Sequence, residues 1–107
     1  MSWHVALKDS AVADFRWFGR KDGRLLLKAA LEHLVADPLA ETRNLKTLRP
    51  NPIAQRELRL LGKYRVLFNV DRGQELVTVV VAGEKRGNAL IVQGEPFEAH
   101  HESDSAE

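Results

Sequence analysis

The stretch RELRLLGKYRVLFNVDRGQELVTVVVAGEKRGNALIV, residues 56–92, decides the fold of this chain. Apolar and polar side chains alternate through much of it, and this period of two is typical of β-strands. One run is apolar on both faces, which indicates a central strand that is covered on both sides. Turns at Asp71–Gln74 and Gly83–Asn88 separate the later strands. The stretch predicts an antiparallel meander, with strands at residues 58–60, 64–70, 76–82 and 89–92.

The chain ahead of the meander predicts one strand and a helical hairpin. Residues 3–7 are typical of a short opening strand. A helix follows, with Asp9 or Ser10 as its N-cap and Gly19 as its stop. A second helix covers about residues 22–36, because its apolar side chains recur at helical spacing.

The order of these elements defines the fold class. The joint between the helices is expected at residues 20–21, and a long loop at residues 38–55, which hold three of the four prolines. A strand, two helices and a meander make an α+β domain, with the helices packed on one face of a four- or five-stranded sheet. The domain is expected to span residues 1–97, and residues 98–107 form a polar, acidic C-terminal tail.

Composition excludes several kinds of site. The chain is 44% hydrophobic and 29% charged, as ordinary globular domains are. It has no cysteine, which excludes disulfides, thiolate metal sites and cysteine nucleophiles. No apolar run approaches the roughly 18 residues of a membrane span. The opening residues, MSWHVALKDS, have neither a basic leader nor an apolar segment, so we predict a cytoplasmic protein.

Positive charge is concentrated in the middle of the chain. Residues 43–65 contain seven lysines and arginines against one acid, Glu57, whereas the formal net charge of the whole chain is +1. Two of these cations, Arg59 and Arg65, fall on predicted strands, which hold side chains in fixed directions. Such a patch indicates a phosphate-rich partner.

Three short motifs follow one another along the chain. They are LKTL at residues 45–48, ELRLLGKYRV at residues 57–66 and VAGEKR at residues 81–86. With these motifs and its order of elements, the chain resembles the RelE/ParE superfamily of toxins from bacterial type II toxin–antitoxin systems. The resemblance covers residues 3 to about 97.

The resemblance implies one of two activities. RelE-like members are metal-free ribonucleases that enter the ribosomal A site and cut messenger RNA. ParE-like members share the fold, lack the nuclease residues and poison DNA gyrase. Both are silenced by a cognate antitoxin that wraps the toxin.

The RelE-like branch is favoured for this chain, because its sheet cations are retained. The partners that the resemblance then implies are a cognate antitoxin, mRNA and the ribosome, with no metal and no cofactor. Two alternatives stay open. One is a gyrase inhibitor of the ParE type, and the other is a relative of weak or lost activity that binds nucleic acid or an antitoxin.

The resemblance also implies roles for the cations. Arg65 matches the arginine of the family's Tyr-Arg strand motif, which stabilises phosphate in RelE-like toxins. Arg59 matches a basic residue of the preceding strand, and Lys85 matches the basic residue after the glycine of the last turn. A planar guanidinium suits the pentavalent phosphorane because it grips two phosphate oxygens at once. The residues expected to bind the RNA around these three are Lys46, Arg49, Arg56, Lys63 and Arg86.

The family's groups for proton transfer are not all present. The final strand, residues 89–92, carries nothing that titrates, and Glu57 stands where a lysine is expected. The available substitutes are Glu57, Glu84, His100 and His101. A tail histidine is favoured, because the unperturbed imidazole pKa of about 6.5 suits either proton-transfer role. Adjacent histidines on a tail rarely converge on one ion, so no metal site is predicted.

Overall fold

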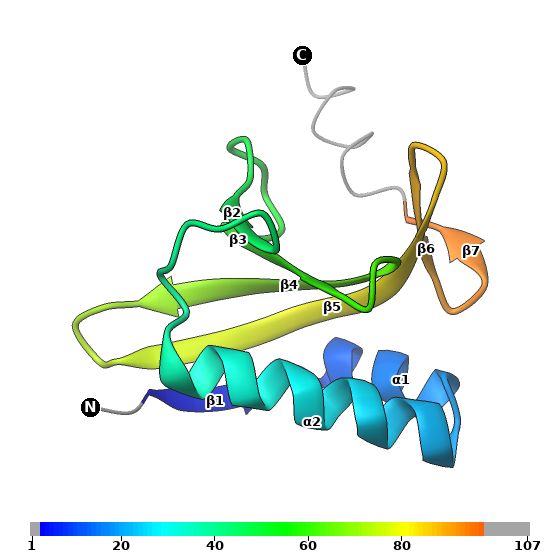
Figure 1. The fold of residues 1–107 in the computed structure, drawn as a ribbon, viewed down its shortest axis with the longest axis horizontal. Coiled ribbons are helices and arrows are strands. Elements are labelled where there is room, and N and C mark those ends of the chain that lie inside the picture. Colours follow the sequence, from blue (N-terminus) through cyan, green and yellow to red (C-terminus); the bar gives the residue numbers. More distant parts are fainter. Residues whose placement is uncertain (1–2, 98–107) are drawn as a thin grey trace.

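The computed structural model describes residues 3–97, which form a seven-stranded sheet with two helices on one face (Figure 1). This arrangement confirms the expected α+β class, and short strands at the two edges raise the strand number above the expected four or five. No helix in this part of the chain is long and apolar enough to cross a membrane. The elements are β1 (His4–Leu7), α1 (Asp9–Trp17), α2 (Arg20–Ala36), β2 (Leu45–Thr47), β3 (Arg56–Leu60), β4 (Tyr64–Asp71), β5 (Leu76–Arg86), β6 (Ala89–Val92) and β7 (Glu95–Pro96).

The sheet is built around β5, the longest strand. β5 pairs with β4 on one side, and on its other side it changes partner along its length. Residues 76–79 pair in parallel with β1, whereas residues 84–86 pair with β6. The strands β2-β3-β4-β5-β6-β7 are neighbours in that order and pair antiparallel. The predicted central strand is therefore confirmed at β5.

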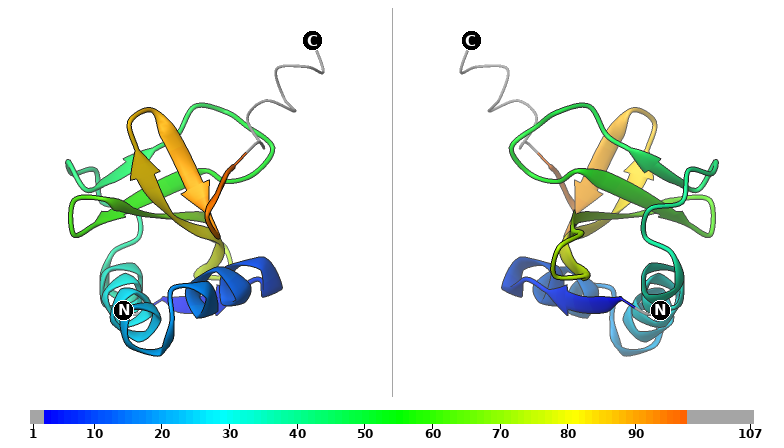
Figure 2. Two further views of the ribbon diagram at one scale, coloured as in Figure 1. Left: turned by 90° about the vertical axis from the view of Figure 1, so that its right-hand side faces the viewer. Right: turned by 90° about the vertical axis from the view of Figure 1, so that its left-hand side faces the viewer.

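The main core lies between the sheet and the helices, which sit beneath the sheet in both end-on views (Figure 2). Val66 and Phe68 of β4 and Leu34 of α2 are all at most 1% exposed. Tyr64 packs against the same core, and its ring meets the Phe18 ring edge-on with the centroids 5.5 Å apart. The alternation in residues 64–70 predicts that Tyr64, Val66 and Phe68 share one face of the strand, and the structure confirms this, with these side chains turned toward the helices.

Both helices begin earlier than the sequence predicts. Lys8 occupies the N-cap position of α1 instead of Asp9 or Ser10, and the Ser10 hydroxyl donates to a carbonyl of β5 at 2.8 Å. α2 begins at Arg20, because the turn between the helices is made at Gly19 and not at the expected residues 20–21. Gly19 makes that turn with a φ of 96°, a conformation that glycine adopts without steric cost.

The close approach of α1 and α2 depends on Gly23. A Cβ atom at this position would lie 2.3 Å from the Phe15 carbonyl oxygen, far inside van der Waals contact. Any side chain there would force the two helices apart, so the glycine fixes the shape of the helical hairpin.

A smaller core lies on the opposite face of the sheet. Leu67 of β4 and Val81 of β5 are buried there with Ala54. Phe97, at the end of the described chain, also packs against this cluster. The connection between β2 and β3 therefore covers part of this face and is not a free loop.

Two stretches expected to be loops contain strand residues. Lys46 lies in β2, inside the expected loop, because β2 pairs with β3, which begins at Arg56, two residues before the expected strand. Lys85 and Arg86 lie in β5, because the pairing of β5 with β6 continues to Arg86. The turn between β5 and β6 is thereby reduced to residues 87–88.

Candidate functional site

Three charged side chains meet on the face of the sheet opposite the helices. Arg59 of β3 lies directly opposite Arg65 of β4 in the strand register, and Glu57 shares the side of β3 that carries Arg59. The Oε2 atom of Glu57 is 3.2 Å from Arg59 Nε and 3.7 Å from Arg65 Nε. We call Glu57, Arg59 and Arg65 the arginine face. It brings together two of the predicted catalytic cations and one of the candidate bases.

Arg65 is the more deeply buried arginine of the arginine face. Its side chain is 9% exposed, and its Nη1 donates to the carbonyl oxygens of Gly62 at 3.2 Å and Tyr64 at 3.1 Å. Its Nε is buried and has no hydrogen-bond partner among the described residues. Burial lowers the pKa of Arg65, the nearby Glu57 carboxylate opposes that shift, and Arg59 adds to it. The backbone therefore fixes Arg65 in one orientation, which is how a preorganised charge is held.

Arg59 lies nearer the solvent than Arg65 does. Its side chain is 34% exposed, and its only ion pair within residues 3–97 is the one with Glu57 through Nε. The pair leaves the two terminal nitrogens of Arg59 without a hydrogen bond to the described chain. Arg59 is therefore the accessible cation of the face, and Arg65 supports it from below.

Gly83 allows the chain to pass close beside the arginine face. It is the register partner of Arg65 on β5, and a Cβ atom there would lie 2.5 Å from the carbonyl oxygen of Ile91 in β6. A larger residue would push β6 away, since the obstacle is backbone. The glycine of the VAGEKR motif thus lets β6 fold tightly over the end of β5.

Lys85 stands on the same side of β5 as Gly83, two residues further along the strand. It lies opposite Leu90 in the register with β6 and is partly exposed. No ion pair in the described part of the chain involves it. The structure therefore places this predicted catalytic residue at the edge of the arginine face, beyond Arg65.

Glu84 belongs to a separate cluster on the other side of β5. It lies opposite Tyr64 in the register, which is the helix-facing side of the sheet. Its Oε2 is 3.7 Å from Lys63 Nζ and 3.5 Å from Arg86 Nε, and Lys63 also lies over the Tyr64 ring, 5.1 Å from its centroid. Lys63 and Arg86 remain more than half exposed. Of the two strand carboxylates considered as bases, only Glu57 belongs to the arginine face.

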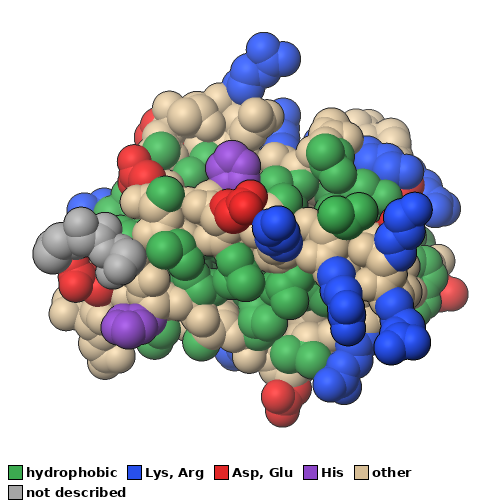
Figure 3. Space-filling model, turned by 60° about the horizontal axis from the view of Figure 1, so that its bottom comes forward, with side chains coloured by type: hydrophobic (Ala, Val, Ile, Leu, Met, Phe, Trp, Pro, Cys, Tyr) green, Lys and Arg blue, Asp and Glu red, His purple; other side chains and the backbone are tan. Residues whose placement is uncertain are grey.

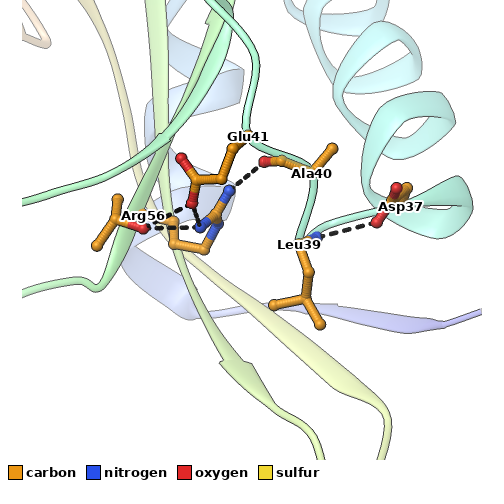
Figure 4. Close-up of polar contacts among 6 residues, drawn as sticks. Asp37, Leu39, Ala40, Glu41 and Arg56 are labelled. Atoms are coloured by element: carbon orange, nitrogen blue, oxygen red, sulfur yellow. Dashed lines mark hydrogen bonds and ion pairs between the residues drawn. The ribbon is translucent and has the colours of Figure 1, made fainter.

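Arg56 differs from the other predicted RNA-binding cations, because it is inside the protein (Figure 4). Its Nη1 donates to Glu41 Oε2 at 2.7 Å and to Thr47 Oγ1 at 2.8 Å, and its Nη2 donates to the Ala40 carbonyl. Arg56 shares the parity of Leu58, so it points to the helix side of β3. The expectation of a surface contact is corrected: Arg56 ties the chain after α2 to β2 and β3.

Two other predicted RNA-binding residues flank the arginine face. Lys46 of β2 lies opposite Glu57 in the register and is partly exposed. Arg49 is exposed in the connection that leads from β2 to β3. His100 and His101 lie outside the described residues. Among residues 3–97 there is no group of three or more side chains suited to hold a metal ion.

A further group of cations lies on the helices and is missing from the sequence prediction. Its members, all exposed, are Arg16, Arg20, Lys21, Arg24 and Lys28. A signal was available, because residues four apart on a helix share a face, as three of these cations do. The charge density of this group is comparable to that of residues 43–65.

The comparisons with known proteins bear on the fold. No protein-family model matches the sequence, and no curated protein matches it. A solved structure, the toxin–antitoxin complex RelBE2 from Mycobacterium tuberculosis, contains a chain with a TM-score of 0.67 and 21% sequence identity to this one. The match covers 79% of this chain and 100% of that chain. The resemblance seen in the sequence is thus confirmed at the level of the fold, and this chain has a RelE-like fold.

Proposed function

We propose that this protein is the toxin of a toxin–antitoxin pair and acts as a metal-free endoribonuclease on messenger RNA. The fold shared with a chain of the RelBE2 complex supports the toxin role. The observation that carries the ribonuclease activity is the arginine face, where Arg59 and Arg65 lie opposite each other with Glu57 within 3.7 Å of both. One fixed cation, one accessible cation and a carboxylate supply charge stabilisation and a base, which are two of the needs of phosphodiester cleavage by an internal nucleophile.

The two arginines would bind the scissile phosphate. Arg59 meets the phosphate first because it is the more exposed of the two. Arg65 adds a second positive charge from below, in an orientation fixed by its bonds to two backbone carbonyls. Negative charge builds up on the phosphorane oxygens in the transition state, so these cations stabilise it more than they stabilise the bound RNA.

Glu57 would take the proton from the 2′-hydroxyl. The 2′ oxygen then forms a bond to phosphorus and the bond from phosphorus to the 5′ oxygen breaks, leaving a 2′,3′-cyclic phosphate and a 5′-hydroxyl. The departing 5′ oxygen takes a proton from an acid, for which the candidates are Lys85, His100 and His101. Glu57 is preferred to the tail histidines as base because it lies within 3.2 Å of the more exposed arginine.

The proposed partners follow from this role. A cognate antitoxin would silence the protein, as a partner protein accompanies the chain of similar fold in RelBE2. Messenger RNA would be the substrate, with the ribosome as the setting in which it is cut. Lys46 and Arg49 would hold the RNA backbone beside the arginine face. Lys63 and Arg86 would hold it at the end of the sheet where β4 begins and β5 ends, and the site of action would be the cytoplasm.

A pulse-labelling experiment separates this proposal from the gyrase alternative. Expression of the wild-type protein should stop the incorporation of labelled methionine before that of labelled thymidine. The Arg65→Lys variant keeps the charge but loses the guanidinium that two backbone carbonyls hold in place, so it should arrest translation weakly. The matched control, Arg72→Lys at the exposed turn between β4 and β5, should behave as wild type. Thymidine incorporation that stops first would contradict the ribonuclease role.

A further inference from the structure

The far side of the molecule carries a second concentration of positive charge. Between residues 16 and 28 there are five cations and one acid, Asp22, and all of them are exposed. Figure 3 shows Lys and Arg side chains gathered at one end of this face, beside an apolar stretch. The five cations, which we call the basic corner, are Arg16, Arg20, Lys21, Arg24 and Lys28.

No acid neutralises the basic corner within the described chain. None of the ion pairs among residues 3–97 involves any of its five cations. Arg20, Arg24 and Lys28 follow one another at four-residue spacing on α2, an arrangement that destabilises a helix through like-charge repulsion. Folding alone therefore gives no reason to gather these charges here.

The cations lie around a shallow hollow and along the open face of α2 beside it. The hollow, of about 310 Å³, has Arg16, Arg20 and Arg24 around a floor that includes Phe15 and Leu27. Beside it, the α2 residues Arg20, Lys21, Arg24, Leu25 and Lys28 form an open surface. Successive turns of a helix are about 5.4 Å apart, close to the distance between neighbouring phosphates in a nucleic-acid strand. The guanidinium groups can therefore reach consecutive phosphates.

The basic corner is connected to the arginine face around one end of the molecule. The ring of Phe18, directly after α1, packs edge-on against the ring of Tyr64 at the start of β4. Lys63, which is 56% exposed, precedes that tyrosine, and Arg65 follows it on the other side of the sheet. A nucleic-acid strand that leaves the arginine face at this end meets Lys63 and then the basic corner.

We propose that the basic corner is a second binding site for the phosphate backbone of RNA and extends the path that begins at the arginine face. The identity of the polyanion as RNA rests on the proposed ribonuclease function. RNA is favoured over a protein partner because five exposed cations stand here with one acid, Asp22, and because the end of the arginine face leads to them through Lys63. The exposed large apolar side chains between Arg16 and Lys28 are Trp17 and Leu25, and an aromatic ring beside cations also suits stacking of an RNA base.

Binding of RNAs of two lengths tests this site. The first variant combines Arg16→Gln, Arg20→Gln and Arg24→Gln, and a matched control changes the exposed cations Lys8, Arg43 and Arg72 to Gln. The probes are labelled single-stranded RNAs of about 5 and about 20 nucleotides, at the lower limit of one binding site and well beyond it. The corner variant should bind the long RNA at least tenfold more weakly than the control variant does. It should bind the short RNA as tightly as the control variant does.

Salt dependence gives a second readout. Each phosphate contact to a single strand contributes about 0.7 to the slope of log K against log salt, so the corner variant should lose about 2 from the slope for the long RNA. A variant with lysine at the same three positions should restore the slope, since backbone binding depends on charge. Unaltered binding of the short RNA by the glutamine variant shows that its weaker binding of the long RNA does not come from misfolding.

The outcomes separate the basic corner from the proposed ribonuclease function. Weaker binding of long RNA by the corner variant, with no cleavage by the wild type, supports the corner and contradicts the ribonuclease function. Cleavage by the wild type with unaltered binding by the corner variant overturns the corner alone. Loss of poly-glutamate binding by the corner variant, without loss of RNA binding, would overturn the corner as an RNA site and assign it to an acidic protein.

Discussion

Arg56 and Arg59 belong to the same short strand but lie in opposite environments. Arg56 is 6% exposed on the helix side of β3, where Glu41, Thr47 and the Ala40 carbonyl accept its hydrogen bonds. Arg59 is on the other side with a 34% exposed side chain, and it shares Glu57 with a second arginine. The two positions are three residues apart, an odd number, so the pleat alone sends them to opposite faces. Charge content does not separate a structural arginine from a functional one here, but strand parity does.

The carboxylates that pair with these two arginines, on opposite faces of β3, also differ. Glu41 has a 62% exposed side chain and makes its ion pair with one buried arginine. Glu57 is 15% exposed and lies between two arginines. An acid between two cations can turn to an incoming hydroxyl while the arginines turn to the phosphate. The comparison therefore predicts that substitutions on the Glu57 side change the chemistry and those on the Glu41 side change stability.

The largest effect is expected from Glu57→Gln. The amide keeps the shape of the side chain but cannot take the 2′ proton, and loss of a general base typically reduces the rate by about 100- to 10,000-fold. Cleavage of labelled mRNA, measured in single-turnover conditions with and without ribosomes, gives this rate. The control is Glu84→Gln, which alters the carboxylate on the helix-facing side. Equal losses of cleavage rate in both variants would contradict the role of Glu57 as the general base.

Arg59→Met tests the exposed arginine with a side chain of similar reach. Cleavage should fall by about 100- to 1,000-fold, the usual loss when one charge-stabilising donor is removed. The thermal melt should stay close to that of the wild type, because the lost ion pair is partly exposed and such pairs contribute little to stability. A variant that melts early but cuts normally would reverse the assignment of the two arginines.

Arg56→Met makes the same substitution three residues away and should give the opposite pattern. Hydrogen bonds from a buried charged group contribute up to about 3 kcal/mol each, and the methionine stem retains the packing, so we expect a loss of about 2 kcal/mol in the free energy of unfolding. Urea denaturation measures it. The cleavage rate of the folded protein should remain within about threefold of wild type, well inside the tenfold change that 1.4 kcal/mol represents. A stable but inactive Arg56→Met protein would place Arg56 in the functional site after all.

These two arginines also show how far the sequence predicts the structure. The alternation in β4 correctly predicts that Tyr64 and Phe68 face the core and that Arg65 faces away from it. The same rule applied to β3 would have placed Arg56 with the core-facing Leu58, so the signal was present. The signal is weak because Arg56 stands at the start of the strand. The Pro-containing stretch directly before it shows no periodicity that would extend the alternation to this residue.

Other features depend on contacts between distant residues and could not be predicted from local pattern. β2 has three residues, too few to show alternation, and becomes a strand because it pairs with β3. Glu41 meets Arg56 across 15 positions of sequence, a contact that only the completed fold creates. The sequence predicted that Arg59 and Arg65 lie on strands, whereas their direct opposition depends on the register of β3 and β4.

The smallest expected effect concerns pH and the Glu41 side of the comparison. The hydrogen bond from Arg56 lowers the pKa of Glu41 below its usual value of 4.5, with a further contribution from Thr47. A depressed carboxyl pKa stabilises the fold above the unfolded-state pKa, and that stability is lost as the pH falls through the folded-state pKa. Glu41→Gln should therefore melt below wild type at pH 7, and the difference should shrink below about pH 4.5.

A double substitution serves as the control for this pH effect. In the Arg56→Met background, Glu41→Gln should change the melting temperature little at either pH, because the partner of the carboxylate is gone. If Glu41→Gln lowers the melting temperature by the same amount in that background, another group, and not Arg56, lowers the pKa of Glu41.

The central claim, that the arginine face cuts RNA through its own 2′-hydroxyl, has one direct test. An mRNA is first mapped for its main cleavage site with the wild-type protein, free and on ribosomes, and is then remade with a single 2′-deoxy nucleotide on the 5′ side of that site. We predict that the all-ribose mRNA yields a 2′,3′-cyclic phosphate and a 5′-hydroxyl, and that the deoxy-substituted mRNA is not cut there. Cleavage at the deoxy position, or no cleavage of the all-ribose mRNA in either setting, would contradict the account.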